Sequence, residues 1–193
     1  MPLDPSLLAS VAASIGVSPH ALSAVVAVES AGSGLDKRGR PLIRVEAHLL
    51  WRHTSGAARA AVDARFKVLG PRAWEGHRFD GASYHGSPAR EWMAFGTAFA
   101  IDSDAAVRAT SWGLGQVLGE WRWLGYASEQ AFVVAQADVA GQLDTMARFI
   151  RARGLVDELR RLDWSGFALG YNGSGNVPVY AAKLAQAYER AAE

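Results

Sequence analysis

The sequence predicts a mainly helical protein of the α+β class, and three observations support this fold class. Apolar residues recur with a helical period in several segments. Only one short stretch, "LIRVEAHLL" at residues 42–50, alternates apolar and polar residues as a strand does. The chain has 193 residues, which is enough to bury one core well but too few for two comfortable domains. We therefore expect residues 1–193 to form a single domain.

The first two helices are predicted from the residues at their starts. Asp4 before Pro5 supplies an N-cap followed by proline at the first helical position, where the missing N–H costs nothing. This pair predicts a helix within residues 1–16 that packs on the rest of the domain. Ser18 and Pro19 repeat the pattern and predict a second helix directly afterwards.

The remaining elements follow from periodicity and turn residues. Residues 70–90 are rich in Gly, Pro, Ser and His, which predicts an irregular surface loop. The segment "AREWMAFGTAFAID" at residues 89–102 is predicted to be helical. An apolar stripe over residues 128–153 predicts one long helix that ends at Gly154. Residues 179–192 predict a final amphipathic helix.

The composition excludes several classes of function. A net charge of +1 provides no basic surface for nucleic acid, so we expect no nucleic-acid partner. The chain has no cysteine, which excludes disulfides, thiol nucleophiles and thiolate metal sites. Its five histidines show no metal-ligand spacing, and we therefore expect no metal and no other cofactor.

A glutamate stands at the end of an apolar helix in "LSAVVAVESAG", residues 22–32. Glu29 follows Val25 by four residues and Val26 by three, which places it on the apolar face. Burial and the negative end of the helix dipole both disfavour the ionised carboxylate, so we expect a raised pKa, as a general acid at neutral pH requires. The alternative is a carboxylate that reaches water or accepts hydrogen bonds from the following turn.

A second glutamate, Glu46, lies in the alternating stretch. It shares the polar side of the predicted strand with Arg44 and His48. Two interpretations stay open from this pattern. Glu46 is either a second functional carboxylate or one member of an exposed row of charged and hydrogen-bonding side chains.

Three ordered motifs resemble the N-acetylmuramidase family of phage endolysins and related bacterial peptidoglycan hydrolases, within the lysozyme-like superfamily. They are "VESAGSGLDKRGRPLIRVEAH", "ATSWGLGQVLG" and "FALGYNGSGNVPVYAAKLAQAY". The resemblance runs from about Ser18 to the last helix. It implies a lysozyme-like fold with several helices and a small β region flanking an active-site cleft. It also implies hydrolysis of the β-1,4 bond between N-acetylmuramic acid and N-acetylglucosamine.

The resemblance also assigns roles to single residues. The catalytic glutamate at the end of the "VES" helix corresponds to Glu29, and the glutamate of the "E-x-H" segment corresponds to Glu46. The positions that the resemblance assigns to substrate binding are His48, Ser111, Gln116, Tyr171 and Asn172. For the glycines of "SWGLGQ" and for Trp112, we favour a tight turn that packs the tryptophan into the core, while for Gln116 we favour contact with the sugar.

The expected mechanism begins with protonated Glu29, which donates to the glycosidic oxygen. A second carboxylate acts either as nucleophile at ~5 Å or as base across a water at ~6.5–9.5 Å, so the stereochemical outcome stays open. Glu46 is our candidate and Asp36 the alternative. Three other interpretations remain: a lytic transglycosylase, a non-catalytic glycan-binding module with this fold, and a helical interaction protein.

The expected partner is the peptidoglycan glycan strand. The first residues, "MPLDPSLLASVAASIG", lack the basic region of a secretory signal, and no window approaches the ~20 apolar residues of a membrane span. We therefore expect synthesis in the host bacterial cytoplasm, no stable membrane association, and action on the cell wall after release through a membrane lesion or a secretion machine. We also expect a monomer.

Overall fold

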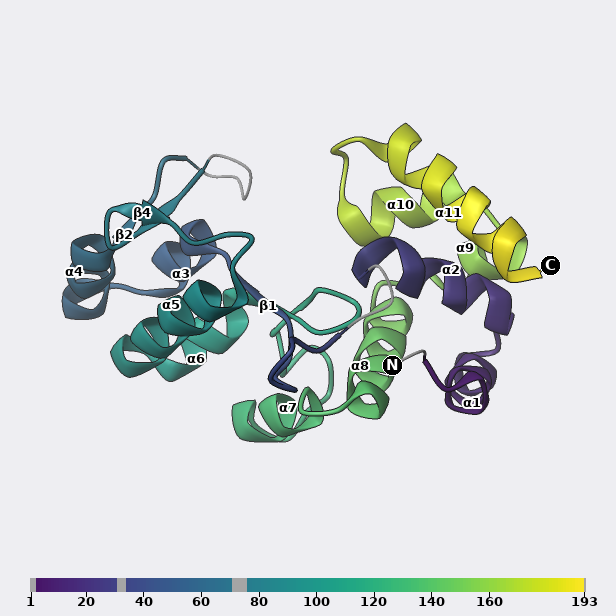
Figure 1. Ribbon diagram of the computed structural model, residues 1–193, viewed down its shortest axis with the longest axis horizontal. Helices are drawn as coiled ribbons and strands as arrows, with labels where there is room; N and C mark the ends of the chain where they lie inside the picture. Colours follow the sequence, from purple (N-terminus) through teal and green to yellow (C-terminus); the bar gives the residue numbers. More distant parts are fainter. Residues whose placement is uncertain (1–2, 31–33, 71–75, 193) are drawn as a thin grey trace.

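Two hydrophobic clusters organise the structure, a computed structural model that describes residues 3–30, 34–70 and 76–192. We call the parts built around them the first and second lobes; they lie on the right and left of Figure 1. The helices of the first lobe are α1 (Pro5–Ile15), α2 (Pro19–Ser30), α8 (Val139–Ala152), α9 (Val156–Arg161), α10 (Trp164–Asn172) and α11 (Val177–Ala192). Those of the second lobe are α3 (Ala47–His53), α4 (Gly56–Arg65), α5 (Pro88–Ile101), α6 (Ser103–Arg108) and α7 (Glu129–Ala135). The prediction of a mainly helical fold is confirmed.

Two small antiparallel sheets complete the fold. The first has the order β1-β5-β6 and consists of β1 (Ile43–Val45), β5 (Thr110–Trp112) and β6 (Val117–Leu118). The second, of order β2-β3-β4, consists of β2 (Phe66–Lys67), β3 (Arg78–Phe79) and β4 (Ala82–Ser83). Trp112 on β5 packs in the second lobe, while Leu114 in the following turn packs in the first. The β5–β6 turn therefore joins the two cores.

The two N-terminal helices begin where the sequence predicts. Asp4 accepts a hydrogen bond from the Ser6 backbone at 2.9 Å, and α1 ends at Gly16, whose φ of 68° is left-handed. Ser18 accepts from the backbone of His20 at 3.2 Å. None of the described helices is by itself long and apolar enough to cross a membrane. Together α1 and α2 have the required length and composition, but they are bent by 110° and their apolar residues pack in the first lobe.

The prediction of one long helix over residues 128–153 is wrong, because the structure has two helices there, α7 and α8. Asp138 caps the start of α8, where its carboxylate accepts from the backbone of Gly141 at 2.8 Å. A Cβ at Gly141 would lie 1.8 Å from the carbonyl oxygen of Ala135, the last residue of α7. The break therefore combines an N-cap with a close approach of two backbones that only glycine permits.

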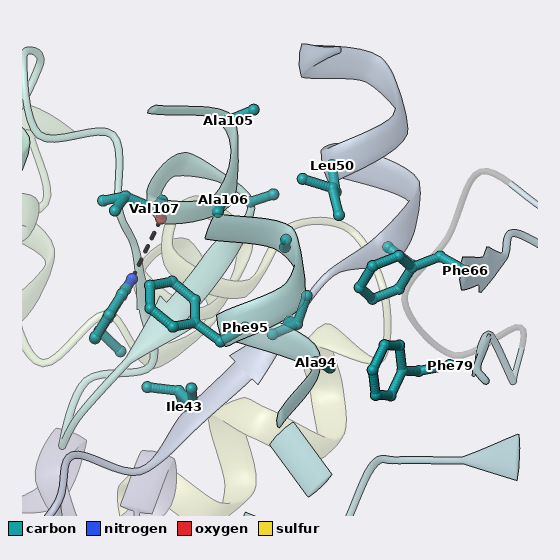
Figure 2. Close-up of a cluster of buried hydrophobic side chains, with 14 of the residues drawn as sticks. Ile43, Leu50, Phe66, Phe79, Ala94, Phe95, Ala105, Ala106 and Val107 are labelled. Carbon is teal, nitrogen blue, oxygen red and sulfur yellow. Dashed lines mark hydrogen bonds between the residues drawn. The ribbon is translucent and has the colours of Figure 1, made fainter. Parts of the chain in front are cut away.

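The prediction of an irregular surface loop over residues 70–90 is also wrong over residues 76–90; residues 71–75 of that prediction lie outside the described residues. This segment carries β3, β4 and the start of α5. Tyr84 is fully buried and packs edge-on against Phe66 and Phe79, which Figure 2 shows within the second-lobe core. The strands have two residues each, too few for a period to be visible among turn-forming residues.

Candidate active site

Glu29 lies in the last turn of α2 and is half-buried. Its Oε1 accepts a hydrogen bond of 2.9 Å from Nδ2 of Asn172, the last residue of α10. Burial raises the pKa of Glu29, while the hydrogen bond from Asn172 and the charge of Lys183 on α11 act in the opposite direction. The net shift is upward, as the helical phase of the sequence predicted.

The Asn172 side chain has a second polar atom, the amide oxygen. Its Oδ1 is buried and has no hydrogen-bond partner among the residues that the structure describes. A buried amide oxygen without a hydrogen-bond partner costs free energy. Asn172 therefore combines a donor that contacts Glu29 with a buried acceptor.

Tyr171 connects this site to the "SWGLGQ" turn. Its hydroxyl donates to the carbonyl oxygen of Gly115 at 2.8 Å, and its ring packs against Phe149 and Phe167. Burial and the nearby charge of Glu29 raise the pKa of Tyr171 well above its ordinary value, so the hydroxyl stays a donor. The fold therefore brings together the three motifs that the sequence separates.

The glycines of "SWGLGQ" serve the turn itself. Trp112 is buried and its Nε1 donates to the carbonyl oxygen of Val107 at 3.2 Å, the dashed line of Figure 2. Gly113 has a φ of 62°, and a Cβ there would lie 2.5 Å from Cδ of Gln142. The tight turn that packs Trp112 into the core, the interpretation favoured from the sequence, is confirmed.

Two polar residues of this motif, Ser111 and Gln116, lie on β5 and in the turn before β6. Ser111 is on β5 opposite Arg44 of β1. Gln116 has a φ of 44°, and its Nε2 donates to the carbonyl oxygen of Gly113 at 3.0 Å. This bond stabilises the turn. The proposed contacts of Ser111 and Gln116 with a sugar remain predictions.

Glu46 is buried, so the interpretation as an exposed charged row is wrong. The strand ends at Val45 and the chain enters α3 at Ala47, which leaves Glu46 at the helix N-terminus with an exposure of 7%. Its Oε1 lies 3.2 Å from Nε of Arg44 and its Oε2 3.7 Å from Nδ1 of His48. Burial raises the pKa of Glu46, which Arg44 and His85 lower and Glu91 raises further.

Glu91 is a buried carboxylate that the sequence interpretation missed. It is 4% exposed on the first turn of α5, where Oε2 accepts from the Val45 backbone at 2.9 Å and Oε1 lies 2.7 Å from Nδ1 of His85. A signal was present: Glu91 stands three residues before Ala94 and four before Phe95, both buried. This helical phase relative to buried residues is the same signal that marks Glu29.

The two predicted catalytic carboxylates lie in different lobes. The polar neighbours of Glu29 are Asn172 and Lys183 in the first lobe. Those of Glu46 belong to the second lobe and its sheet. The structure therefore gathers Glu29 with Tyr171 and Asn172, and Glu46 with His48, as two separate groups.

Asp36, the alternative second carboxylate, is engaged in a turn. It accepts from the backbone of Arg38 at 2.8 Å and from the backbone and guanidinium of Arg40 at 2.8–3.0 Å. Burial alone would raise the pKa of Asp36, but these hydrogen bonds together hold it below its ordinary value. Such a carboxylate is fixed and ionised, which suits a structural role in the turn.

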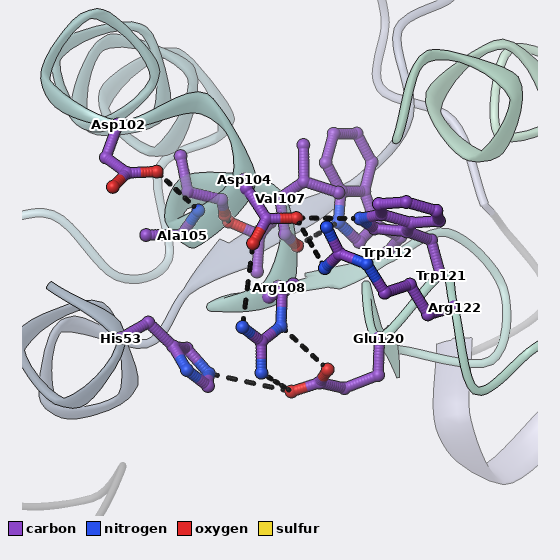
Figure 3. Close-up of polar contacts among 12 residues, drawn as sticks. His53, Asp102, Asp104, Ala105, Val107, Arg108, Trp112, Glu120, Trp121 and Arg122 are labelled. Atoms are coloured by element: carbon purple, nitrogen blue, oxygen red, sulfur yellow. Dashed lines mark hydrogen bonds and ion pairs between the residues drawn. The ribbon is translucent and has the colours of Figure 1, made fainter. Parts of the chain in front are cut away.

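Another polar network lies in the second lobe and holds it together (Figure 3). Asp104 accepts from Nε1 of Trp121 at 3.0 Å, and Arg108 Nε lies 2.8 Å from Glu120 Oε2. His53 Nε2 lies 3.6 Å from Glu120 Oε1. These contacts join α3 and α6 to the segment after β6. Within the described part of the chain, no group of three or more His, Cys, Asp or Glu side chains could hold a metal ion.

Comparisons with known proteins identify the family of this chain. The family model of the muramidases, described as N-acetylmuramidase, matches residues 18–192, a range that contains all three motifs. Among solved structures, the crystal structure of the Burkholderia AP3 phage endolysin is similar, with 31% sequence identity and a TM-score of 0.78, and the match covers 99% of this chain and 71% of that one. No curated protein matches the sequence. The chain belongs to the N-acetylmuramidase family.

Proposed function

We propose that this protein is a peptidoglycan hydrolase that cleaves the β-1,4 bond between N-acetylmuramic acid and N-acetylglucosamine, with Glu29 as the general acid. The family match and the endolysin neighbour support peptidoglycan hydrolysis by a glycosidase-type enzyme. The observation that carries the role of Glu29 is its setting at the end of α2, half-buried and held by Asn172 at 2.9 Å.

The surroundings of Glu29 suit both stages of proton transfer. Burial favours the protonated carboxyl, which gives its proton to the glycosidic oxygen as the bond to the anomeric carbon breaks through an oxocarbenium-like transition state. The carboxylate left behind accepts the hydrogen bond from Asn172 and feels the positive charge of Lys183. A water then forms the new bond to the anomeric carbon, and the proton it loses goes to Glu46 acting as base or to the Glu29 carboxylate.

Glu46 is our candidate for the second carboxylate. It is buried, and the charges of Arg44 and His85 favour its ionised form. In this role, Glu46 acts as base toward the water or as nucleophile toward the anomeric carbon. His48 at 3.7 Å would orient the carboxylate or contact the sugar.

The test is digestion of purified peptidoglycan with product analysis by mass spectrometry. We expect wild-type protein to release fragments with reducing N-acetylmuramic acid ends. Glu29→Gln keeps the size of the side chain and its contact to Asn172, and should lower the rate at least ~100-fold because the proton donor is lost. Glu189→Gln, the same change on the exposed face of α11, should be fully active.

Three outcomes would contradict the proposal. Near-normal activity of Glu29→Gln would exclude Glu29 as the acid. Products that end in anhydro sugars would identify a lytic transglycosylase. Binding to peptidoglycan without cleavage by the wild-type protein would identify a glycan-binding module.

A further inference from the structure

Gln142 is a buried amide that the proposed chemistry does not use. It lies on α8 and is 1% exposed. Its Oε1 accepts from the backbone N–H of Leu114 at 2.9 Å. Its Nε2 donates to the carbonyl oxygens of Gly34 at 3.3 Å and Gln136 at 2.8 Å. One side chain therefore satisfies three backbone groups from three separate segments.

Two of these segments flank the proposed active site. Gly34 belongs to the chain that leaves α2, five residues after Glu29, and Leu114 belongs to the β5–β6 turn. The same turn accepts the hydroxyl of Tyr171 through Gly115 at 2.8 Å, next to the Asn172 that holds Glu29. Gln142 thus connects Gly34 to the turn that Tyr171 contacts.

Backbone hydrogen bonds close this junction. The Leu42 N–H donates to the Gly34 carbonyl oxygen at 2.8 Å, and the Gly113 N–H donates to the Leu42 carbonyl oxygen at 2.8 Å. The Gly34 oxygen therefore accepts from both Leu42 and Gln142. The junction has little freedom to rearrange while Gln142 is in place.

The glycines at this junction are explained by Gln142. A Cβ at Gly34 would lie 1.9 Å from Gln142 Oε1, and a Cβ at Gly113 would lie 2.5 Å from Gln142 Cδ. Both segments therefore approach the amide more closely than any other residue type allows. The side chain and its two glycines form one packed unit.

We infer that Gln142 is a positioning residue, which fixes the β5–β6 turn against the chain that leaves the Glu29 helix and so sets the geometry of the glycan site. The inference rests on the proposed function of Glu29. None of the hydrogen bonds of Gln142 involves Glu29. The effect of Gln142 is transmitted through the Leu114 and Gly34 backbones.

The experiment compares Gln142→Met with Thr145→Val. Methionine has a similar shape but cannot make the three hydrogen bonds. Thr145 is the matched control, because it is 1% exposed on the same helix and bonds to Gln136, Tyr126 and Gly141, but not to the β5–β6 turn. Both variants lose buried hydrogen bonds and should have a lower Tm.

Activity is measured well below both transitions, at a temperature where both proteins are folded. We expect kcat on peptidoglycan to fall at least ~10-fold in Gln142→Met, the effect of a small misplacement of site groups, and to stay within ~2-fold in Thr145→Val. The pH of half-maximal activity should not move in either variant, because the contacts of Glu29 are untouched. Hydrogen exchange at the Leu114 amide should accelerate only in Gln142→Met.

The possible outcomes separate the two claims. Equal activity of the two variants, or an unchanged Leu114 amide in Gln142→Met, would overturn the role of Gln142 while leaving the proposed function intact. A wild-type protein without cleavage activity would refute both. If Gln142→Met does not fold, Gln142→Asn replaces it, since this shorter amide remains polar but cannot reach both Gly34 and Leu114.

Discussion

At the scale of single residues, burial and a hydrogen bond shift the pKa of Glu29 in opposite directions. Burial favours the neutral acid, and Asn172 favours the carboxylate. Asn172→Leu removes this donor, so the pKa of Glu29 should rise. Since the acid works in its protonated form, the alkaline limb of the pH–activity profile should move to higher pH.

The same variant should also reach a lower maximal rate, because the carboxylate formed on proton transfer loses its donor. The measurement is kcat as a function of pH, with Gln186→Leu on the exposed face of α11 as control. An alkaline limb that stays in place would show that Asn172 does not act on the acid.

Glu46 provides a second residue-scale prediction, in which stability and activity change in opposite directions. Burial raises its pKa in the folded state, so the neutral carboxyl contributes stability at low pH that is lost as the pH rises through the folded pKa. Glutamine stays neutral throughout. Wild type should therefore lose stability relative to Glu46→Gln as the pH rises. The difference in Tm, variant minus wild type, should be larger at about pH 7 than at about pH 4.

If Glu46 is the second catalytic carboxylate, Glu46→Gln should also lose at least ~100-fold in rate, an effect typical of an acid–base group. Thermal unfolding at the two pH values and digestion of peptidoglycan measure the two effects. Full activity in a folded Glu46→Gln would remove Glu46 from the mechanism.

At the scale of elements, the β5–β6 turn depends on glycine for two separate reasons. Gly113→Ala would place a Cβ on left-handed backbone, which costs about 1–2 kcal/mol, and also against Gln142, where overpacking typically costs about 1–3 kcal/mol. Gly39 has a similar φ of 74° but nothing within 4 Å. Gly39→Ala should therefore show the backbone cost alone.

Urea denaturation of both glycine variants checks this expectation. Gly113→Ala should be the more destabilised of the two, and it should also lose activity where it is folded. Equal losses of stability would mean that Gln142 yields to the new methyl group.

The element scale also shows where local patterns were sufficient. The caps at Asp4 and Ser18 predicted both N-terminal helices, because the signal lies within two residues of the helix start. The break between α7 and α8 was missed, although Asp138 is an equally local cap, since the apolar stripe continues across it. Periodicity by itself does not distinguish one helix from two that share a face.

At the scale of the whole molecule, α1 is part of the first lobe although the family match begins at residue 18. Ile15 is buried in that lobe, so Ile15→Ala should cost about 2–5 kcal/mol. Below the transition, the variant should retain peptidoglycan cleavage because α1 makes none of the contacts described for Glu29.

Thermal unfolding and activity at a lower temperature measure this prediction. Val134→Ala is the control, since that side chain is 71% exposed and its loss should have little effect. An Ile15→Ala variant as stable as wild type would show that α1 contributes nothing to the fold.

The sequence by itself determined the fold class, the family resemblance, and Glu29 as the residue to follow. These depend on residue order and helical phase, which are local properties. The tertiary structure alone decided which groups meet: Asn172 lies 143 residues from Glu29 along the chain, and Gly34 lies 108 from Gln142. The tertiary structure also places the carboxylates of Glu46 and Glu91 in buried positions. Contacts over such separations are set by how the helices pack, and no local pattern specifies them.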